Sequence, residues 1–107
     1  MYKTRVSVPA TARRGEIIEI RTLIAHPMES GFRRDASGTL IPRDILKSFT
    51  CTYQGETVFH MEFYPGIAAN PFLSFRLRAT RSGEIGFAWI DQNGASTRAS
   101  ATLEVAD

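Results

Sequence analysis

Apolar and polar residues alternate in short runs along most of the chain, and each run is bounded by glycine, proline, asparagine or aspartate. A period of two residues is typical of β-strands with one buried and one exposed face. The cleanest run lies at residues 73–79, where Leu73, Phe75 and Leu77 alternate with Arg76 and Arg78. The alternation therefore predicts an all-β protein.

About seven such runs follow one another, with turn residues roughly every 8 to 12 positions. They cover residues 2–8, 16–24, 49–54, 57–63, 73–79, 85–90 and 97–105. The two runs on either side of Gly55 predict a hairpin. This count in a chain of 107 residues fits two packed antiparallel sheets. We predict an immunoglobulin-like β-sandwich that forms a single domain over residues 1–107.

Residues 42–48 are the one segment with a helical alternative. Pro42 suits the first position of a helix, and Asp44 suits the positive end of a helix dipole. Ile45 and Leu46 would give such a turn an apolar side. We expect at most one helical turn here.

The connection over residues 26–47 is far longer than an ordinary loop between strands. Its apolar residues Met28, Phe32, Leu40 and Ile41 are set among charges and glycines. Long ordered loops often carry function. Two interpretations remain open: these side chains fold back as a lid over the core, or they contact a partner.

Two of the predicted strands have small, uncharged residues on their outer faces. These are Gly86, Ala88 and Ile90 on one strand, and Thr50 and Thr52 on another. Such a face suits the docking of another sheet or an edge strand. The alternative is that these small residues pack under a neighbouring loop.

Charge and composition exclude several classes of protein. Apolar residues make up 43% and charged residues 22%, which is the usage of an ordinary folded domain. The net charge is only +2, and the basic residues Arg5, Arg21, Arg76, Arg78 and Arg98 are scattered along the sequence rather than bunched. Nucleic-acid binding usually needs a basic stripe, so no nucleic-acid partner is expected.

The amino-terminal residues run directly into a strand pattern. No apolar stretch has the length of a signal peptide core or of a membrane span. Taken alone, this predicts a soluble protein with no membrane insertion and no export signal of its own.

Cys51 is the single cysteine, so the chain has no internal disulfide and no multi-cysteine metal site. Together with His26, His60 and either Met28 or Met61, it supplies the ligand types of a copper site on a β-sandwich. These residues also define the alternative function of a small metal or thiol protein. Against it, Cys51 and His60 fall on different strands of the predicted hairpin, in different registers.

Cys51 also shares a predicted strand face with Phe49 and Tyr53. A cysteine on an apolar face is usually a small buried hydrophobe rather than a nucleophile. The sequence offers no paired carboxylates, no glycine-rich phosphate loop and no Ser/His/Asp arrangement with a supporting spacing. We therefore expect a protein that is not an enzyme.

Several segments resemble the SoxZ family of sulfur-oxidation proteins. The most specific is His-Pro-Met-Glu-Ser-Gly-Phe-Arg-Arg-Asp at residues 26–35, followed by Gly38, Leu-Ile-Pro-Arg at 40–43 and Phe-Thr-Cys at 49–51. Ala-Asn-Pro-Phe at 69–72, the turn at 80–83, Phe-Ala-Trp at 87–89 and Asp-Gln-Asn-Gly at 91–94 continue the likeness in order. The resemblance covers nearly the whole chain.

The resemblance implies a non-catalytic subunit without a cofactor, which forms a heterodimer with a SoxY-type carrier subunit in thiosulfate oxidation. In that family the partner's glycine-rich C-terminal arm bears the cysteine that carries the sulfur intermediates. This chain shows neither feature, so the implied role is that of a scaffold. The resemblance also implies transient contacts with other Sox enzymes and a periplasmic location, reached by export with a signal-bearing partner.

By position, the resemblance places the partner contacts in the long loop. Arg33 and Arg34 would favour an anionic thiosulfonate on a passing carrier arm, because guanidinium groups pair well with oxyanions; a solvated arginine pair is the alternative. The predicted partner-binding residues are His26, Pro27, Met28, Gly31, Phe32, Arg33, Arg34, Asp35, Ile41 and Pro42.

Overall fold

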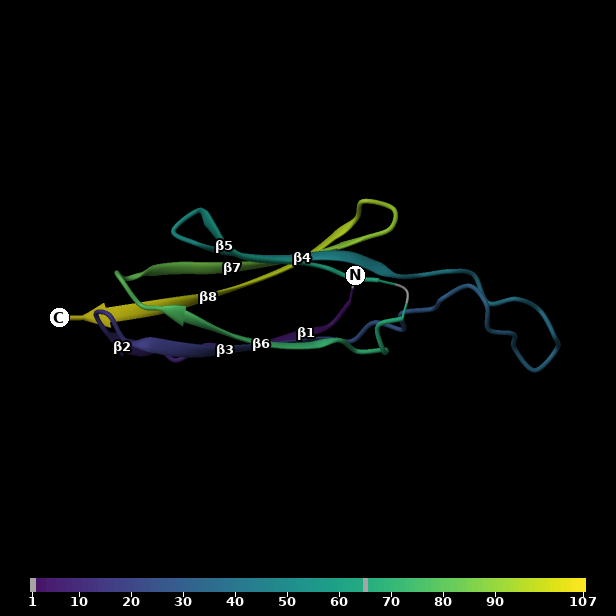
Figure 1. The fold of residues 1–107 in the computed structure, drawn as a ribbon, viewed down its shortest axis with the longest axis horizontal. Coiled ribbons are helices and arrows are strands. Elements are labelled where there is room, and N and C mark those ends of the chain that lie inside the picture. The colour runs from purple at the N-terminus through teal and green to yellow at the C-terminus, as the bar shows by residue number, and fades with distance from the viewer. Residues whose placement is uncertain (1, 65) are drawn as a thin grey trace.

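A computed structural model describes residues 2–64 and 66–107 and folds them into two β-sheets, which lie as two layers in Figure 1. The three-stranded sheet has the order β1-β3-β6, and the five-stranded sheet has the order β2-β8-β7-β4-β5. The predicted all-β, immunoglobulin-like sandwich is confirmed. The strands are β1 (Thr4–Ser7), β2 (Thr11–Arg13), β3 (Ile17–Ile24), β4 (Leu46–Tyr53), β5 (Glu56–Glu62), β6 (Phe72–Arg78), β7 (Gly83–Asp91) and β8 (Ser96–Ala106).

Seven of these strands correspond to the predicted runs, and β2 is additional. It has three residues and pairs in parallel with β8, with Ala12 opposite Val105. Three residues are too few to show an alternating pattern, and parallel pairing joins segments far apart in sequence. The predicted hairpin is confirmed: β4 and β5 pair antiparallel around Gly55, which has a φ of 80°.

The helical alternative for residues 42–48 is not adopted. Asp44 forms a β-bridge with Glu29, and β4 begins at Leu46. Ile45 is buried, and its N–H donates to the Gln92 side chain at 3.2 Å. A single helical turn fixes several dihedral angles for one hydrogen bond, so pairing with distant segments prevails. None of the described residues forms a helix long and apolar enough to cross a membrane.

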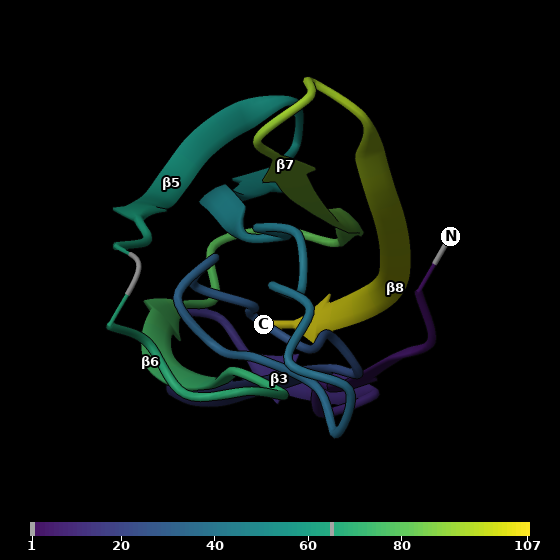
Figure 2. The same ribbon diagram turned by 90° about the vertical axis from the view of Figure 1, so that its right-hand side faces the viewer.

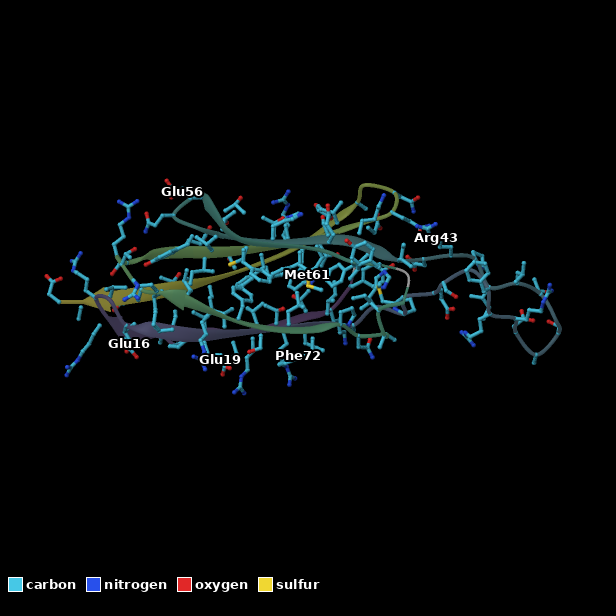
Figure 3. The ribbon with its side chains drawn as sticks, in the orientation of Figure 1. Glu16, Glu19, Arg43, Glu56, Met61 and Phe72 are labelled. Carbon is cyan, nitrogen blue, oxygen red and sulfur yellow. The ribbon has the colours of Figure 1, made fainter. Side chains whose placement is uncertain are left out.

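Aromatic side chains hold the two layers together. Phe49 on β4 is fully buried, and its ring centroid lies 5.1 to 6.3 Å from those of Phe59, Phe75, Phe87 and Trp89. Phe75 belongs to the three-stranded sheet and stacks on Phe59 of the other sheet at 4.4 Å. In Figure 3 the side chain of Met61 also points between the layers. The inner faces of both sheets therefore meet around Phe49.

The molecule is elongated, with extents of 60 × 20 × 20 Å. Figure 1 shows why: between β3 and β4 the chain leaves the sandwich and extends well beyond its end. Figure 2 looks along the molecule from that end. We call residues 29–44 the arm. The sandwich thus presents one projecting segment, and it is the long loop noted in the sequence.

Replacing Phe49 with alanine should lower the free energy of unfolding by about 3 to 5 kcal/mol, because it removes the ring at the centre of the aromatic cluster. Urea denaturation measures this change. Val58→Ala is the control, since Val58 is 41% exposed and should cost less than about 1 kcal/mol. Equal losses in the two variants would contradict a core centred on Phe49.

Candidate partner-binding surface

The arm is a hairpin held by two isolated β-bridges. At its base Glu29 and Asp44 exchange backbone hydrogen bonds of 2.8 and 2.9 Å. Further out Arg34 bridges Leu40. These bridges pair backbone groups that in an irregular loop would form hydrogen bonds with water. The arm is therefore an ordered projection.

The tip of the arm is closed by Asp35. Its Oδ1 accepts hydrogen bonds from the backbone N–H groups of Ser37 and Thr39 at 2.9 and 3.0 Å, and from the Ser37 hydroxyl at 2.9 Å. The bond from the Ser37 hydroxyl, followed by those from the backbone, lowers the pKa of Asp35. Gly38 has a φ of 84°, which the turn requires and which side chains disfavour. Arg34 donates to the Gly38 carbonyl at 2.7 Å.

A polar cluster around buried His26 fixes the root of the arm, by which we mean His26, Met28 and Asp44. His26 is 1% exposed, and its Nδ1 accepts the Met28 N–H at 2.9 Å, so the proton of the neutral ring lies on Nε2. Nε2 lies 3.4 Å from Asp44 Oδ1, yet among the described residues it makes no hydrogen bond of normal geometry. The Tyr2 hydroxyl donates to Asp44 Oδ2 at 3.1 Å, and its ring lies 4.5 Å from that of His26. The cluster joins the amino terminus to both strands of the arm.

The returning strand of the arm is also tied to the turn between β7 and β8. The Gln92 side chain accepts from the Ile45 N–H and donates to the Arg43 carbonyl at 2.9 Å. The Gln92 N–H donates to the Ile45 carbonyl at 3.0 Å. On the inner side, the Met28 sulfur accepts the Leu46 N–H at 3.3 Å. The root is thus anchored to the five-stranded sheet.

The structure separates the apolar residues of the arm from those of the core. Phe32 is 87% exposed and Leu40 is 48% exposed, so neither acts as a lid. Met28, by contrast, is buried, and Ile41 is half-buried. An exposed phenylalanine on an ordered projection is the feature of the surface that most favours a partner contact.

The predicted partner-binding residues therefore divide into two groups, and their role in binding stays a prediction. His26 and Met28 lie in the root, where they position the arm rather than face outward. Gly31 is half-buried against Arg43, where a Cβ would lie 3.1 Å from the arginine Cβ. The exposed members are Pro27, Phe32, Arg33, Arg34, Asp35 and Pro42, and Ile41 is half-buried.

The two arginines of the arm differ from a free anion-binding pair. Arg33 is paired with Glu29, with an Nη2–Oε1 distance of 2.5 Å and a second contact of 3.2 Å. The hydrogen bond from Arg33 lowers the pKa of Glu29. Arg34 has one Nη engaged with the Gly38 carbonyl. A passing oxyanion would have to displace or share these contacts.

The residues of the metal or thiol alternative are not brought together. Cys51 is fully buried on the inner face, where burial raises its pKa to about 11. His60 is exposed on the outer face and hydrogen-bonds the Thr50 hydroxyl at 2.8 Å, while His26 lies in the root of the arm. Across residues 2–64 and 66–107, no three His, Cys, Asp or Glu side chains come close enough to hold a metal ion.

The small residues expected on an outer face lie together on the five-stranded sheet, but the face is not free of charge. Gly86, Ala88 and Ile90 of β7 and Thr50 and Thr52 of β4 are half-buried and line one shallow hollow of about 560 Å³, which Glu84 and Arg98 also line. The hollow opens outward, so these residues do not pack under a loop.

The five arginines that are scattered along the sequence do not stay scattered in the fold, which brings four of them together and leaves Arg98 on β8. Antiparallel pairing gathers Arg5, Arg21, Arg76 and Arg78 on the outer face of the three-stranded sheet, where Glu19 is the one carboxylate of its strands. Figure 3 shows Glu19 and Phe72 pointing outward on this side. We call this the basic face. Spacing in the sequence does not show it, because it depends on the register between three separate strands.

Comparison with known proteins identifies the family. The family model described as "Sulphur oxidation protein SoxZ" matches residues 5–102, which is almost the whole chain. The chain belongs to the SoxZ family. No curated protein sequence matches it.

Several solved structures share the fold of this SoxZ family member. The sulfur carrier protein SoxY from Chlorobium limicola f thiosulfatophilum is 14% identical, with a TM-score of 0.67 over 97% of this chain and 79% of that one. A superoxide reductase (neelaredoxin) from Ignicoccus hospitalis is 15% identical, with a TM-score of 0.71 over 96% and 80%. A CARDB domain from Pyrococcus furiosus is 8% identical, with a TM-score of 0.54 over 99% and 94%. At these identities the likeness is one of fold alone.

Replacing His26 with alanine should cost about 1 to 3 kcal/mol of stability, because the Met28 N–H loses its acceptor inside the root. Hydrogen exchange should also accelerate across the arm. His60→Ala is the matched control and should stay within about 0.5 kcal/mol, since His60 is exposed. If exchange in the arm is the same in both variants, His26 does not hold the root.

The buried thiol should be inert and should make stability depend on alkaline pH. Burial raises the pKa of Cys51 to about 11 in the folded state, so iodoacetamide at neutral pH should react only after unfolding. An unfolded cysteine has a pKa of about 8.5, so the thiol of the folded protein stays protonated to higher pH than that of the unfolded chain. The free energy of unfolding therefore falls as pH rises through about 9 to 11. Over that pH range, the free energy of unfolding of Cys51→Ala should fall by about 2 to 3 kcal/mol less than that of the wild type, as measured by urea denaturation. Rapid alkylation of the folded wild type would contradict a buried thiol.

Proposed function

We propose that this chain is the non-catalytic scaffold subunit of a SoxYZ-type sulfur carrier complex, and that its arm binds a SoxY-type subunit. Membership of the SoxZ family and the shared fold of SoxY support the proposal. The observation that carries it is Phe32, which is 87% exposed on an arm rooted by buried contacts.

The energetics favour Phe32 as an anchor. Aromatic side chains dominate many interfaces because they bury a large apolar area with few rotatable bonds. An arm that is ordered before binding loses less conformational entropy when a partner covers it. The bridges at Glu29 and Arg34 and the turn at Asp35 supply this order. Leu40, half exposed across the hairpin, would extend the same contact.

The environment of Cys51 supports a scaffold rather than a carrier. A sulfur carrier needs an accessible thiolate, since the thiolate is the nucleophile. Cys51 is fully buried, and its raised pKa keeps it protonated at neutral pH. The sulfur chemistry is therefore assigned to the partner's cysteine, within a heterodimer that works in thiosulfate oxidation. Periplasmic location through co-export and transient contacts with other Sox enzymes belong to the same proposal.

Phe32→Ala should weaken binding of the SoxY-type subunit from the same organism by about 30-fold or more, which is the loss of about 2 kcal/mol expected of an interface hot spot. Co-expressed subunits can be purified, and their affinity measured by titration calorimetry. Val58→Ala, a partly exposed apolar residue of the sandwich, is the control and should bind as the wild type does. Unchanged affinity of the Phe32 variant would remove the arm from the interface.

A further inference from the structure

Beyond the arm, one edge of the three-stranded sheet is open along β6. The strand order β1-β3-β6 places β6 last, where it pairs with β3 alone. An extended peptide can join such an edge through main-chain hydrogen bonds. We propose that the β6 edge binds an extended segment of a protein other than the SoxY-type subunit, in which acidic and apolar residues alternate. No residue of the arm takes part in this contact, which is separate from the proposed binding of the carrier subunit.

Hydrogen bonds at the two ends of β6 show which of its backbone groups point to the open edge. At one end the Pro71 carbonyl accepts the Ile24 N–H at 3.3 Å. At the other end the Ala79 N–H donates to the Glu16 carbonyl at 2.8 Å. Successive residues of a strand direct these groups to opposite sides, so the odd-numbered residues of β6 face β3. The groups at the open edge belong to the even-numbered residues Phe72, Ser74, Arg76 and Arg78.

Within the described residues, β6 is the longest regular edge of the sandwich. The other edge of its sheet, β1, has four residues, and β2 at the edge of the five-stranded sheet has three. β5 has seven residues, but its register with β4 shifts between Cys51 and Thr52. Such a bulge bends an edge strand and protects it from pairing. β6 has seven residues and pairs with β3 in unbroken register, so its open edge is regular over its whole length.

The outer side of the β6 edge is positively charged. Arg76 and Arg78 are exposed there, two positions apart on one face. Glu19 lies opposite Arg76 on β3, but both oxygens of its carboxylate are already engaged. Arg21 lies 2.8 Å from one oxygen, and the Ser74 hydroxyl donates to the other at 3.1 Å. Opposite charges on adjacent strands attract one another, so a strand joined to β6 should carry carboxylates on its outer face.

The inner side of the same edge is apolar and incompletely covered. Leu73, Phe75 and Leu77 of β6 point inward, yet they are only half-buried. Phe59 of β5 stacks on Phe75 at 4.4 Å and is also half-buried. Figure 2 shows the reason: β5 and β6 lie at the same side of the sandwich, and each is the last strand of its own sheet. Apolar side chains on the inner face of an added strand would cover these residues, so apolar residues should alternate with the acidic ones.

A second copy of this chain is a poor occupant of the edge. Antiparallel pairing of two β6 strands would place Arg76 and Arg78 of both copies on one face, where like charges repel. Charged side chains are a common protection of edge strands against self-pairing. They also disfavour permanent burial, because an arginine that is covered without a partner must be desolvated at a cost. The edge therefore suits a reversible contact with an acidic segment, which would weaken as salt is added.

The probe is a short peptide in which glutamate alternates with valine, titrated into the full chain by calorimetry. A peptide that alternates lysine with valine should bind at least about tenfold more weakly, because its charges repel the arginines. An N-methylated form of the glutamate peptide should also bind at least about tenfold more weakly, since it lacks the backbone donors of a strand. When the glutamate peptide is added, hydrogen exchange should slow at the N–H groups of Ser74, Arg76 and Arg78.

Substitutions in β6 separate the role of charge from that of strand pairing. Arg76→Glu should weaken binding of the glutamate peptide by at least about tenfold and should make the lysine peptide the tighter ligand. Ser74→Pro removes one outward N–H without changing the charge, and it should also weaken binding of the glutamate peptide by at least about tenfold. Proline is tolerated where the N–H of an edge strand faces water, so this variant should fold.

Arg5→Glu is the matched control for the change of charge. Arg5 lies on the same outer face as Arg76 but on β1, two strands away from the open edge. Because salt screens charges over such distances, binding of the glutamate peptide should stay within about twofold of the wild type. Thermal unfolding checks that each variant is folded.

The carrier subunit and a second copy are tested as competing occupants of the edge. The glutamate peptide should bind the co-purified complex with the SoxY-type subunit as tightly as it binds the chain alone. Displacement of the peptide by that subunit would assign the edge to the heterodimer and overturn the inference, while the proposed function would stand. Dimerisation of the isolated chain that Ser74→Pro abolishes would also overturn it, as would equal binding of the glutamate and lysine peptides. Failure of the SoxY-type subunit to bind at all would remove the proposed function but not the peptide site.

Discussion

The contact between Phe49 of one sheet and Phe75 of the other constrains everything that the two outer faces display. Side chains alternate between the faces of a strand, so a register that turns Phe49 inward necessarily turns Thr50 outward. The same holds on β7, where buried Phe87 and Trp89 leave Ala88 on the outside. A slip by one residue would expose the aromatic core and bury the outward residues Thr50 and Ala88, so the core packing also fixes the surface chemistry.

The arm depends on a second, local constraint at its root. Burial of a polar ring such as His26 is unfavourable unless its nitrogen atoms find partners. Nδ1 accepts the Met28 N–H, whereas Nε2 lies 3.4 Å from the Asp44 carboxylate without a hydrogen bond of normal geometry, and Tyr2 in turn binds Asp44. The cluster therefore ties three separate segments together at one point. This explains how a segment with few core contacts of its own keeps a defined direction away from the sandwich.

The sequence predicted a strand correctly wherever apolar and polar residues alternate within that one segment. Period-two alternation revealed the seven longer strands and placed Cys51 on the buried face, because both follow from neighbours along the chain. What it missed depends on contacts between distant segments: the three-residue strand β2, the bridge at Asp44 that replaces a helical turn, and the gathering of arginines on the basic face. It identified the arm residues but could not separate the inward Met28 from the outward Phe32, since the loop has no period.

The outer face of the three-stranded sheet carries much of the positive charge of the molecule. The chain carries a net charge of only +2, yet four arginines and one glutamate lie on the basic face, so the remaining surface is close to neutral or acidic. Charges that stay in water keep a protein soluble, whereas charges at the centre of a permanent interface must be desolvated at a cost. The outer face of the five-stranded sheet also carries charge, at Glu84 and Arg98, so among the described residues Phe32 on the arm remains the most exposed large apolar side chain.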